Sequence, residues 1–237
     1  MIQNAELHLL QKALGYSYNN IEYLRTALIH SSYANEMRSK GEIVESNERL
    51  EFLGDAVLET VISEHLYNRY EKRREGALTK MRQQLVCEKT LAKIASEIGL
   101  GQYIMIGKGE EGTDLRKRPK VLADCLEAVI ASIYLDMGKG TGVDFSDLII
   151  RLFEKKISQV ENSQATDYKT MLQQFSEQDA TVVLKYITEQ SGEPHSPSFL
   201  TVAYVNNNAV GEGAARTKKE SEMLAAKQAL KLFGIIE

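Results

Sequence analysis

Apolar residues three and four positions apart recur through the first two thirds of the chain, and this spacing predicts a series of helices. The predicted helices cover residues 5–14, 20–33, 47–70, 76–99, 121–138 and 145–157. No run of alternating apolar and polar residues, the pattern typical of a strand, interrupts them. We therefore expect the first part of the chain to be all α.

The period of the apolar pattern changes after the polar stretch KKISQVENSQATD. A short helix is predicted over 167–178, then strands over 182–189, 199–205 and 207–213, then a closing helix over 218–233. The order α-β-β-β-α indicates a small α+β domain behind the all-α domain. We place the domains at residues 1–160 and 167–237, with a flexible linker at 161–166.

The composition is that of an ordinary folded chain, with 43% hydrophobic and 26% charged residues in a length of 237. No stretch approaches the ~18–20 consecutive apolar residues of a membrane span, and the N-terminal segment carries charges where a signal peptide needs an apolar run. We expect a cytoplasmic protein without a membrane partner. Because the net charge is −4, any binding to a polyanion has to come from local groups of cations.

Carboxylates share one face of the helix predicted over 47–70. Glu48, Glu51 and Asp55 lie there at i, i+3 and i+7. The same helix is otherwise apolar nearly all round, which predicts that it is buried. Like charges on a buried helix repel one another and resist the loss of water unless a cation neutralises them. A cation site is the simplest explanation of this face.

The helix predicted over 121–138 repeats the pattern, with acids at i and i+3 among apolar residues. If the two helices pack face to face, four carboxylates converge, those of Glu51, Asp55, Asp124 and Glu127. An all-oxygen set of this kind suits Mg²⁺, with Mn²⁺ as a substitute. Acids three or four apart are also common on solvated or salt-bridged helix faces, and spacing alone does not decide between the two explanations.

The segment between residues 101 and 120 is rich in glycine and then basic, a composition that suggests a nucleotide site. The phosphate-binding loop requires G-x-x-x-x-G-K-[S/T], whereas Gly101 and Gly107 are one residue too far apart and Lys108 is followed by glycine. We therefore expect no nucleotide cofactor. The segment fits a mobile loop whose cations face either phosphates or plain solvent, namely Arg116, Lys117, Arg118 and Lys120.

Together these motifs resemble those of the ribonuclease III family. NERLEFLGDAVLE is similar to the family's signature, and RPKVLADCLEAVIASIYLD is similar to its second acidic motif. LRTALIHSSYANE and REGALTKMRQQLV resemble two further segments, so the resemblance covers residues 12–155 almost continuously. One departure is Lys120, which stands where many members have a small polar residue.

The resemblance implies an endonuclease that acts as a homodimer and cuts double-stranded RNA by Mg²⁺-dependent hydrolysis. The positions that match the family's metal ligands are Glu51, Asp55, Asp124 and Glu127. The positions that match its catalytic acids are Asp55, Glu127, Glu48 and Glu75, the last two of which assist substrate and metal binding. Because the metal acidifies water and neutralises developing negative charge, no His or Ser base is needed.

The resemblance also implies products and an assembly. Cleavage is expected to leave 5′-phosphate and 3′-hydroxyl ends with short 3′ overhangs, in the processing of rRNA precursors and mRNA. Phe52 matches the aromatic residue that family members insert into the partner subunit, although an ordinary core phenylalanine fits its spacing as well. The alternative function is a non-cleaving regulator that binds double-stranded RNA. Loss of a metal-site carboxylate would favour that alternative, and all six acids are present.

Cations stand at the start of the helix predicted over 218–233, where the helix macrodipole already favours negative charge. Arg216, Lys218 and Lys219 are explained by a phosphate at this helix N-terminus, or equally by pairing with the acids of the first turn. The polar side of the helix predicted over 167–178 carries groups that can meet ribose hydroxyls and base edges. They are Thr170, Gln173 and Gln174, and a plain solvated face also explains them.

The second domain resembles the double-stranded RNA-binding domain over its whole length. The element order agrees, and so do the segments KTMLQ, GEPHSPSF and TKKESEMLAA. The resemblance implies that the polar face of the first helix reads one minor groove and that His195 and its loop reach a second. The cations at the start of the last helix then hold the phosphates between them. Ala215, Thr217 and Ser221 are mild departures from the family pattern.

Overall fold

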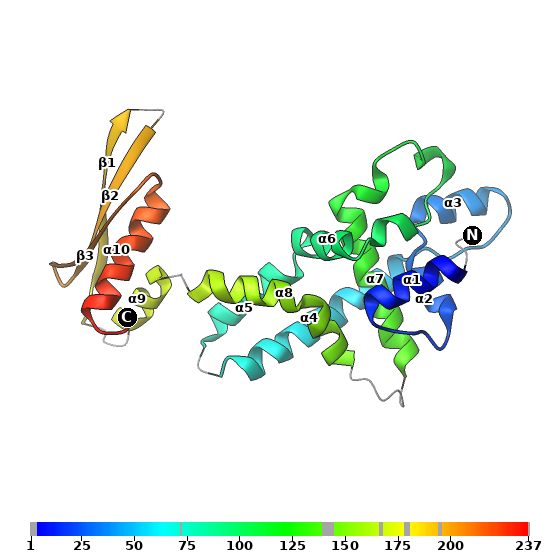
Figure 1. The fold of residues 1–237 in the computed structure, drawn as a ribbon, viewed down its shortest axis with the longest axis horizontal. Coiled ribbons are helices and arrows are strands. Elements are labelled where there is room, and N and C mark those ends of the chain that lie inside the picture. Colours follow the sequence, from blue (N-terminus) through cyan, green and yellow to red (C-terminus); the bar gives the residue numbers. More distant parts are fainter. Residues whose placement is uncertain are drawn as a thin grey trace. The chain divides into compact units, whose positions relative to one another are not determined.

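The computed structural model describes residues 4–71, 73–138, 145–165, 168–177, 181–193 and 196–236. The chain divides into two compact units, Met1–Val160 and Glu161–Glu237, which are described separately (Figure 1). The helices up to the boundary are α1 (Asn4–Leu14), α2 (Ile21–Ala27), α3 (Ser31–Ser39), α4 (Glu48–Arg69), α5 (Glu75–Val86), α6 (Glu88–Glu97), α7 (Pro119–Met137) and α8 (Phe145–Ala165). Short 3₁₀ helices cover Leu100–Tyr103, Lys108–Glu110 and Leu115–Lys117.

α7 is the central helix of the first unit, and α2, α4 and α6 pack against it. Most of its side chains are apolar or small and are buried, among them Leu126, Val129 and Ile130. Pro119 opens the helix, where a missing backbone N–H has no cost, and Gly138 follows its last residue with a φ of 47°. The prediction of an all-α first domain is confirmed. Among the described residues, no helix is long and apolar enough to cross a membrane.

Two stretches predicted as single helices are each divided in two. The helix predicted over 20–33 forms α2 and α3 because the chain between them pairs with Met105. The backbone N–H of Met105 donates to the carbonyl of Leu28 at 2.8 Å, and the N–H of His30 donates to the carbonyl of Met105 at 3.0 Å. The helix predicted after α4 forms α5 and α6 because Cys87 adopts an extended conformation with φ −71° and ψ 151°.

Two segments predicted as irregular are ordered into helical structure. Residues 161–165, assigned to the linker, continue α8, whose polar end contains no glycine or proline to stop it. The glycine-rich segment over 101–120, predicted as a mobile loop, contains the 3₁₀ helices and buries Leu115. In both cases a polar composition was interpreted as loop, although polar residues are equally typical of solvated helical turns.

The second unit contains α9 (Tyr168–Ser176), β1 (Leu184–Glu193), β2 (Ser196–Val205), β3 (Asn208–Ala215) and α10 (Lys218–Leu232). The strands form an antiparallel sheet in the order β1-β2-β3. α9 and α10 cover one face of this sheet (Figure 1), around a core that includes Leu172, Ala203 and Leu230. A Cβ at Gly213 would lie 2.4 Å from the carbonyl oxygen of Ser221, so glycine lets β3 approach α10 closely. The predicted α+β domain is confirmed.

Candidate metal centre and RNA-binding surface

α4 and α7 pack together at Gly54, whose missing side chain allows a very close approach. A Cβ built on this residue would lie 1.9 Å from the carbonyl oxygen of Glu127. Gly54 stands between Glu51 and Asp55 on α4, so the tightest contact of the two helices falls on their acidic faces. The sequence interpretation missed this residue, although a glycine inside an otherwise apolar helix is a signal of close backbone approach.

Three of the four predicted metal ligands gather at this contact. Carboxylate oxygens of Glu51, Asp124 and Glu127 lie within 4.8 Å of one another. Asp55 is not part of this tightest group, but it lines the same cleft of about 870 Å³, as does Glu48. The structure therefore brings five of the six predicted acids to one cleft between α4 and α7.

Burial and mutual repulsion raise the pKa values of two of these acids, Glu51 and Glu127. The pKa of Glu127 is raised to about 8, mainly by burial and further by the negative charges of Asp55, Asp124 and Glu51. Burial, followed by the charge of Asp124, also raises the pKa of Glu51. Bringing a cation into the cleft would relieve both effects, because it offsets the repulsion and replaces lost hydration.

Another acid on α7, Asp136, provides a contrast because its charge is already satisfied by the protein. Asp136 is buried, yet its carboxylate accepts hydrogen bonds from the Tyr16 hydroxyl at 2.8 Å and from the backbone N–H groups of Asn19 and Asn20 at 2.7 Å each. It ties the segment before α2 to α7. In the described part of the chain, the Glu127 carboxylate receives no such hydrogen bond. Asp136 therefore has its charge stabilised by donors of the protein, whereas Glu127, within the described residues, does not.

The basic residues before α7 divide into two groups. Arg116 donates from Nε to the carbonyl of Ile104 at 2.9 Å, and Lys117 pairs with Asp114 at 2.9 Å, so both have partners within the protein. Arg118 and Lys120 line the acidic cleft. Of the cations predicted to face phosphates, these two are the ones placed at the candidate metal centre.

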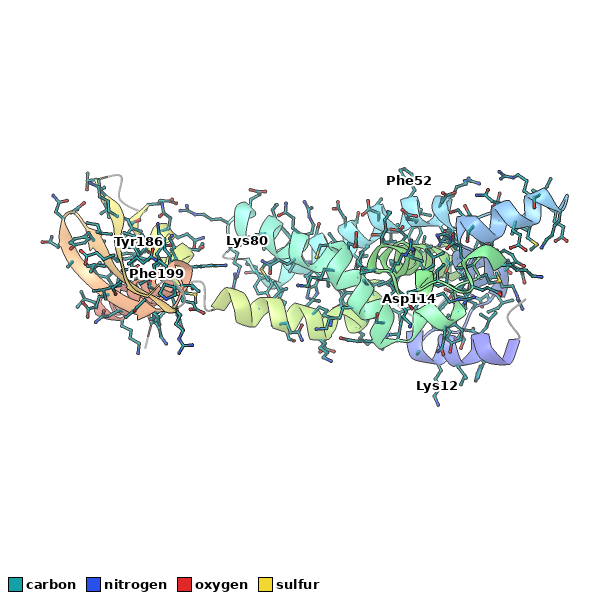
Figure 2. All side chains as sticks on the ribbon, turned by 90° about the horizontal axis from the view of Figure 1, so that it is seen from above. Lys12, Phe52, Lys80, Asp114, Tyr186 and Phe199 are labelled. Carbon is teal, nitrogen blue, oxygen red and sulfur yellow. The ribbon has the colours of Figure 1, made fainter. Side chains whose placement is uncertain are left out.

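The exposed face of α4 contradicts the expectation that this helix is buried on all sides. Phe52 is 81% exposed and points away from the helical domain (Figure 2). Farther along the same face, Ala56 and Tyr67 line a second groove of about 860 Å³ between α4 and α5. Glu75 lines this groove and not the acidic cleft. Within one chain, therefore, the structure does not bring Glu75 to the other acids.

α9 presents the predicted polar groups on the side away from its buried Leu172. Thr170 and Gln173 are exposed and Gln174 is half-buried. The side-chain amide of Gln173 donates to the carboxylate of Glu177 at 3.0 Å. These side chains are accessible to a ligand.

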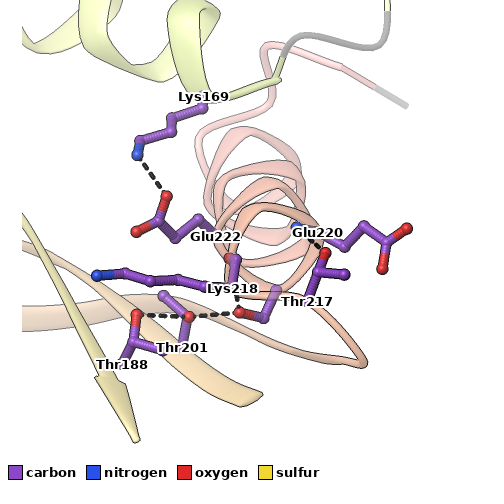
Figure 3. Close-up of polar contacts among 8 residues, drawn as sticks. Lys169, Thr188, Thr201, Thr217, Lys218, Glu220 and Glu222 are labelled. Atoms are coloured by element: carbon purple, nitrogen blue, oxygen red, sulfur yellow. Dashed lines mark hydrogen bonds and ion pairs between the residues drawn. The ribbon is translucent and has the colours of Figure 1, made fainter. Parts of the chain in front are cut away.

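The start of α10 is fixed by hydroxyl groups (Figure 3), and the predicted cations are exposed there. Thr217 caps the helix, since its side-chain oxygen accepts from the N–H of Glu220 at 3.2 Å. Beneath the helix, the hydroxyl of Thr188 bonds that of Thr201 at 2.8 Å, and Thr201 bonds the hydroxyl of Ser221 at 2.7 Å. Ser221 in turn donates to the carbonyl of Lys218 at 2.9 Å. The exposed cations of this surface are Arg216, Lys218 and Lys219.

An ion pair that the sequence did not reveal joins the two helices of this surface. Lys169 of α9 contacts the carboxylate of Glu222 of α10 at 2.5 Å (Figure 3). Its ammonium also lies 5.0 Å from the ring centre of Tyr186. The pair links the start of α9 to the first turns of α10. His195, predicted to contact a second groove, lies outside the described residues.

Comparisons with known proteins match both units. A family described as Ribonuclease-III-like matches residues 20–151, and one described as double-stranded RNA binding motif matches residues 168–232. A curated protein named Ribonuclease 3 from Clostridium beijerinckii is 44% identical over 226 residues, which is 94% of each chain. Ribonuclease 3 from Listeria welshimeri is 43% identical over 222 residues, covering 93% of this chain and 95% of its own.

Solved structures agree with these matches over the helical unit. The nuclease domain of ribonuclease III from Campylobacter jejuni is 37% identical, with a TM-score of 0.55, and covers 65% of this chain and 97% of its own. A second structure of that domain, 38% identical and also with a TM-score of 0.55, covers 63% and 96%. It is described as having structural flexibility in a region involved in dimer formation. With curated relatives matched along nearly its whole length, this chain belongs to the ribonuclease III family, as an endoribonuclease that carries a double-stranded RNA-binding domain.

Proposed function

We propose that this endoribonuclease hydrolyses double-stranded RNA with the help of a divalent cation, with Mg²⁺ as the metal and Mn²⁺ as a substitute. The observation that carries the proposal is the convergence of Glu51, Asp124 and Glu127 within 4.8 Å at the contact of α4 and α7. The donors are all carboxylate oxygens, the ligands that these hard cations prefer. Asp55, which lines the same cleft, is the proposed fourth ligand.

The residues of the cleft have distinct proposed roles. A divalent cation bound there supplies acidified water and neutralises charge that develops on the phosphate. Asp55 and Glu127 are the proposed catalytic acids beside the reacting phosphodiester, and the exposed Glu48 assists binding at the rim. When water attacks phosphorus, its oxygen remains on the phosphate and the 3′-oxygen leaves with a proton. The expected products therefore carry 5′-phosphate and 3′-hydroxyl ends.

The second domain is proposed to hold the duplex by its shape. Hydroxyl and amide groups on α9, from Thr170, Gln173 and Gln174, are accessible to ribose 2′-hydroxyls in the wide minor groove of A-form RNA. Arg216, Lys218 and Lys219 surround a helix N-terminus, which favours phosphate. In this proposal, α9 contacts the ribose hydroxyls of the duplex and the start of α10 contacts its phosphates.

A homodimer is proposed through the exposed face of α4. Phe52 lines the acidic cleft with 81% of its surface exposed, and Ala56, one helical turn later, lines the second groove. An exposed aromatic side chain of this kind is typical of a surface that a partner covers. An isologous dimer through Phe52 would carry two acidic clefts and so cut both strands, leaving short 3′ overhangs. A role for Glu75 in cleavage then depends on the partner, because Glu75 lines the groove. Duplex stems in rRNA precursors and mRNA are the proposed substrates.

Two variants separate cutting from binding in one experiment. Glu127→Gln keeps the shape of the side chain but removes the charge that a metal needs, so we expect cleavage of a long RNA duplex to fall by at least about a hundredfold. Binding measured without cleavage, in EDTA, should stay within about twofold of wild type because RNA affinity comes mainly from cations elsewhere. End mapping of the wild-type products tests the predicted 5′-phosphates and overhangs.

The complementary variant replaces Lys218 and Lys219 with alanine. Duplex affinity should fall, and the slope of log affinity against log salt should decrease in magnitude by about two, because two fewer phosphate contacts release counterions.

A Glu127→Gln enzyme that still cleaves the duplex would show that Glu127 is not part of the metal centre. A wild-type protein that binds duplex but leaves it intact with Mg²⁺ and Mn²⁺ would favour the non-cleaving regulator.

A further inference from the structure

Lys120 is the side chain with the closest positive charge to the acidic cleft. Its ammonium lies 3.2 Å from Oδ2 of Asp124 and 3.4 Å from Oδ1. The same charge acts on Glu51 and Glu127, whose pKa values it lowers against the larger effects of burial and repulsion. One ammonium therefore partly neutralises all three carboxylates that gather between α4 and α7.

Helix stability does not explain this pair. Lys120 is the second residue of α7, and a cation in the first turn opposes the helix macrodipole. It also stands N-terminal to its acidic partner at i,i+4, which is the weaker order for such a pair. The carboxylates of the cleft, and not the helix, account for the position of the ammonium.

The ammonium is free to leave without disturbing the fold. The Lys120 side chain is 73% exposed, whereas that of Asp124 is 25% exposed. The acid is therefore fixed in the cleft, and the base reaches it from solvent on a flexible stem. A divalent cation that takes Asp124 as a ligand has to compete with this contact.

We propose that Lys120 is a tethered counterion of the metal centre, which occupies Asp124 in the metal-free protein and must move away when a divalent cation binds. The proposal rests on the proposed function of the cleft. In this arrangement Lys120 limits the affinity for the cation and keeps the repelling acids together before the cation arrives. A static surface ion pair, by contrast, would leave metal binding unaffected.

The test measures Mn²⁺ binding to the full chain without RNA, by isothermal titration calorimetry at low ionic strength. Lys120→Met keeps most of the stem and removes the charge. We expect it to bind Mn²⁺ roughly three- to tenfold more tightly, the order expected when a unit charge a few ångströms from a divalent ion in a solvated site is removed. Lys120→Arg, which keeps the charge, should stay near wild type.

Lys117→Met is the matched control, because Lys117 lies in the same basic segment but pairs with Asp114 at 2.9 Å, and neither residue lines the cleft. Its Mn²⁺ affinity should equal that of wild type. Unchanged or weaker binding by a folded Lys120→Met protein, checked by thermal melting, would overturn the counterion role while leaving the metal centre intact. If neither wild type nor any variant binds Mn²⁺, both the metal centre and the counterion are rejected.

Discussion

Two acids on α7, the buried Asp136 and the half-buried Glu127, differ in their immediate partners. Asp136 accepts hydrogen bonds from one hydroxyl and two backbone N–H groups, so its charge stabilises the packing of α7 against the segment before α2. Glu127 is surrounded by other acids, and burial raises its pKa to about 8. In the sequence, both are carboxylic acids in an apolar stretch. Only the donors around each carboxylate distinguish a structural acid from a candidate ligand.

The raised pKa of Glu127 predicts that the metal-free protein loses stability as pH rises. The folded state holds this proton up to about pH 8, whereas the unfolded chain releases it near the ordinary value of 4.5. The contribution is therefore complete below about pH 4.5 and is lost by about pH 8. Replacing Glu127 with Gln should raise the free energy of unfolding at pH 8.5 by ~1–2 kcal/mol, after solvent screening at a half-buried site is allowed for.

Urea denaturation in EDTA at pH 5 and pH 8.5 measures this difference. At pH 5 the variant should differ little from wild type, because the folded carboxyl is already protonated. Glu154→Gln, an exposed position on α8, is the control and should have no pH-dependent effect. An equal effect of Glu127→Gln at both pH values would contradict the raised pKa.

At the scale of elements, the candidate metal centre depends on how closely α4 and α7 pack. Because a Cβ at Gly54 would lie 1.9 Å from the carbonyl oxygen of Glu127, Gly54→Ala must push the helices apart. We expect a loss of about 2–4 kcal/mol in unfolding free energy. Mn²⁺ binding should weaken as well, since Glu51 and Glu127 move apart with their helices.

Gly76→Ala provides the control, because a Cβ at Gly76 in α5 meets nothing within 4 Å. That variant should be as stable as wild type or more stable by up to ~1 kcal/mol, as alanine favours a helix. Denaturation and calorimetry measure both quantities. Full stability together with unchanged Mn²⁺ affinity in Gly54→Ala would show that the close contact is not required.

The apolar period predicted most helices but not where the chain leaves them. The break between α2 and α3 depends on hydrogen bonds of Leu28 and His30 to Met105, a partner about 75 residues farther along the chain. Local periodicity contains no information on such a partner. At Cys87 the apolar pattern simply continues through the break. The end of α8 was missed for the opposite reason, since the helix continues to Ala165 through a polar sequence without an apolar pattern.

At the scale of the whole molecule, the exposed Phe52 is the residue on which the proposed homodimer depends. Phe52→Ala should weaken a dimer at least about tenfold, because aromatic side chains at an interface contribute most of its binding energy. Sedimentation equilibrium across a concentration series measures the change. Ile43→Ala is the control, since Ile43 is 97% exposed on another part of the unit. Equal dimer constants for both variants and wild type would place the interface elsewhere.

The sequence predicted those features of the site that depend on neighbouring residues of one helix, and not those that depend on packing between helices. The spacing of Glu51 and Asp55 on one helix face is a local property, and the sequence contained it. The meeting of that face with Asp124 and Glu127 depends on Gly54, a packing contact between helices. The placement of Glu75 in the other groove depends on the turn between α4 and α5. Spacing therefore predicted the candidate ligands, and helix packing decided which of them lie close together.

The row of hydroxyls that runs from Thr188 to the start of α10 has only one possible proton order. Ser221 gives its single proton to the carbonyl of Lys218, so Thr201 must donate to Ser221, and Thr188 must donate to Thr201. The O–H dipoles are consequently aligned, with every positive end directed from the sheet toward the helix that begins with Lys218 and Lys219. Removing the middle hydroxyl would break both links at once, whereas removing the outermost one would leave the helix end of the row intact.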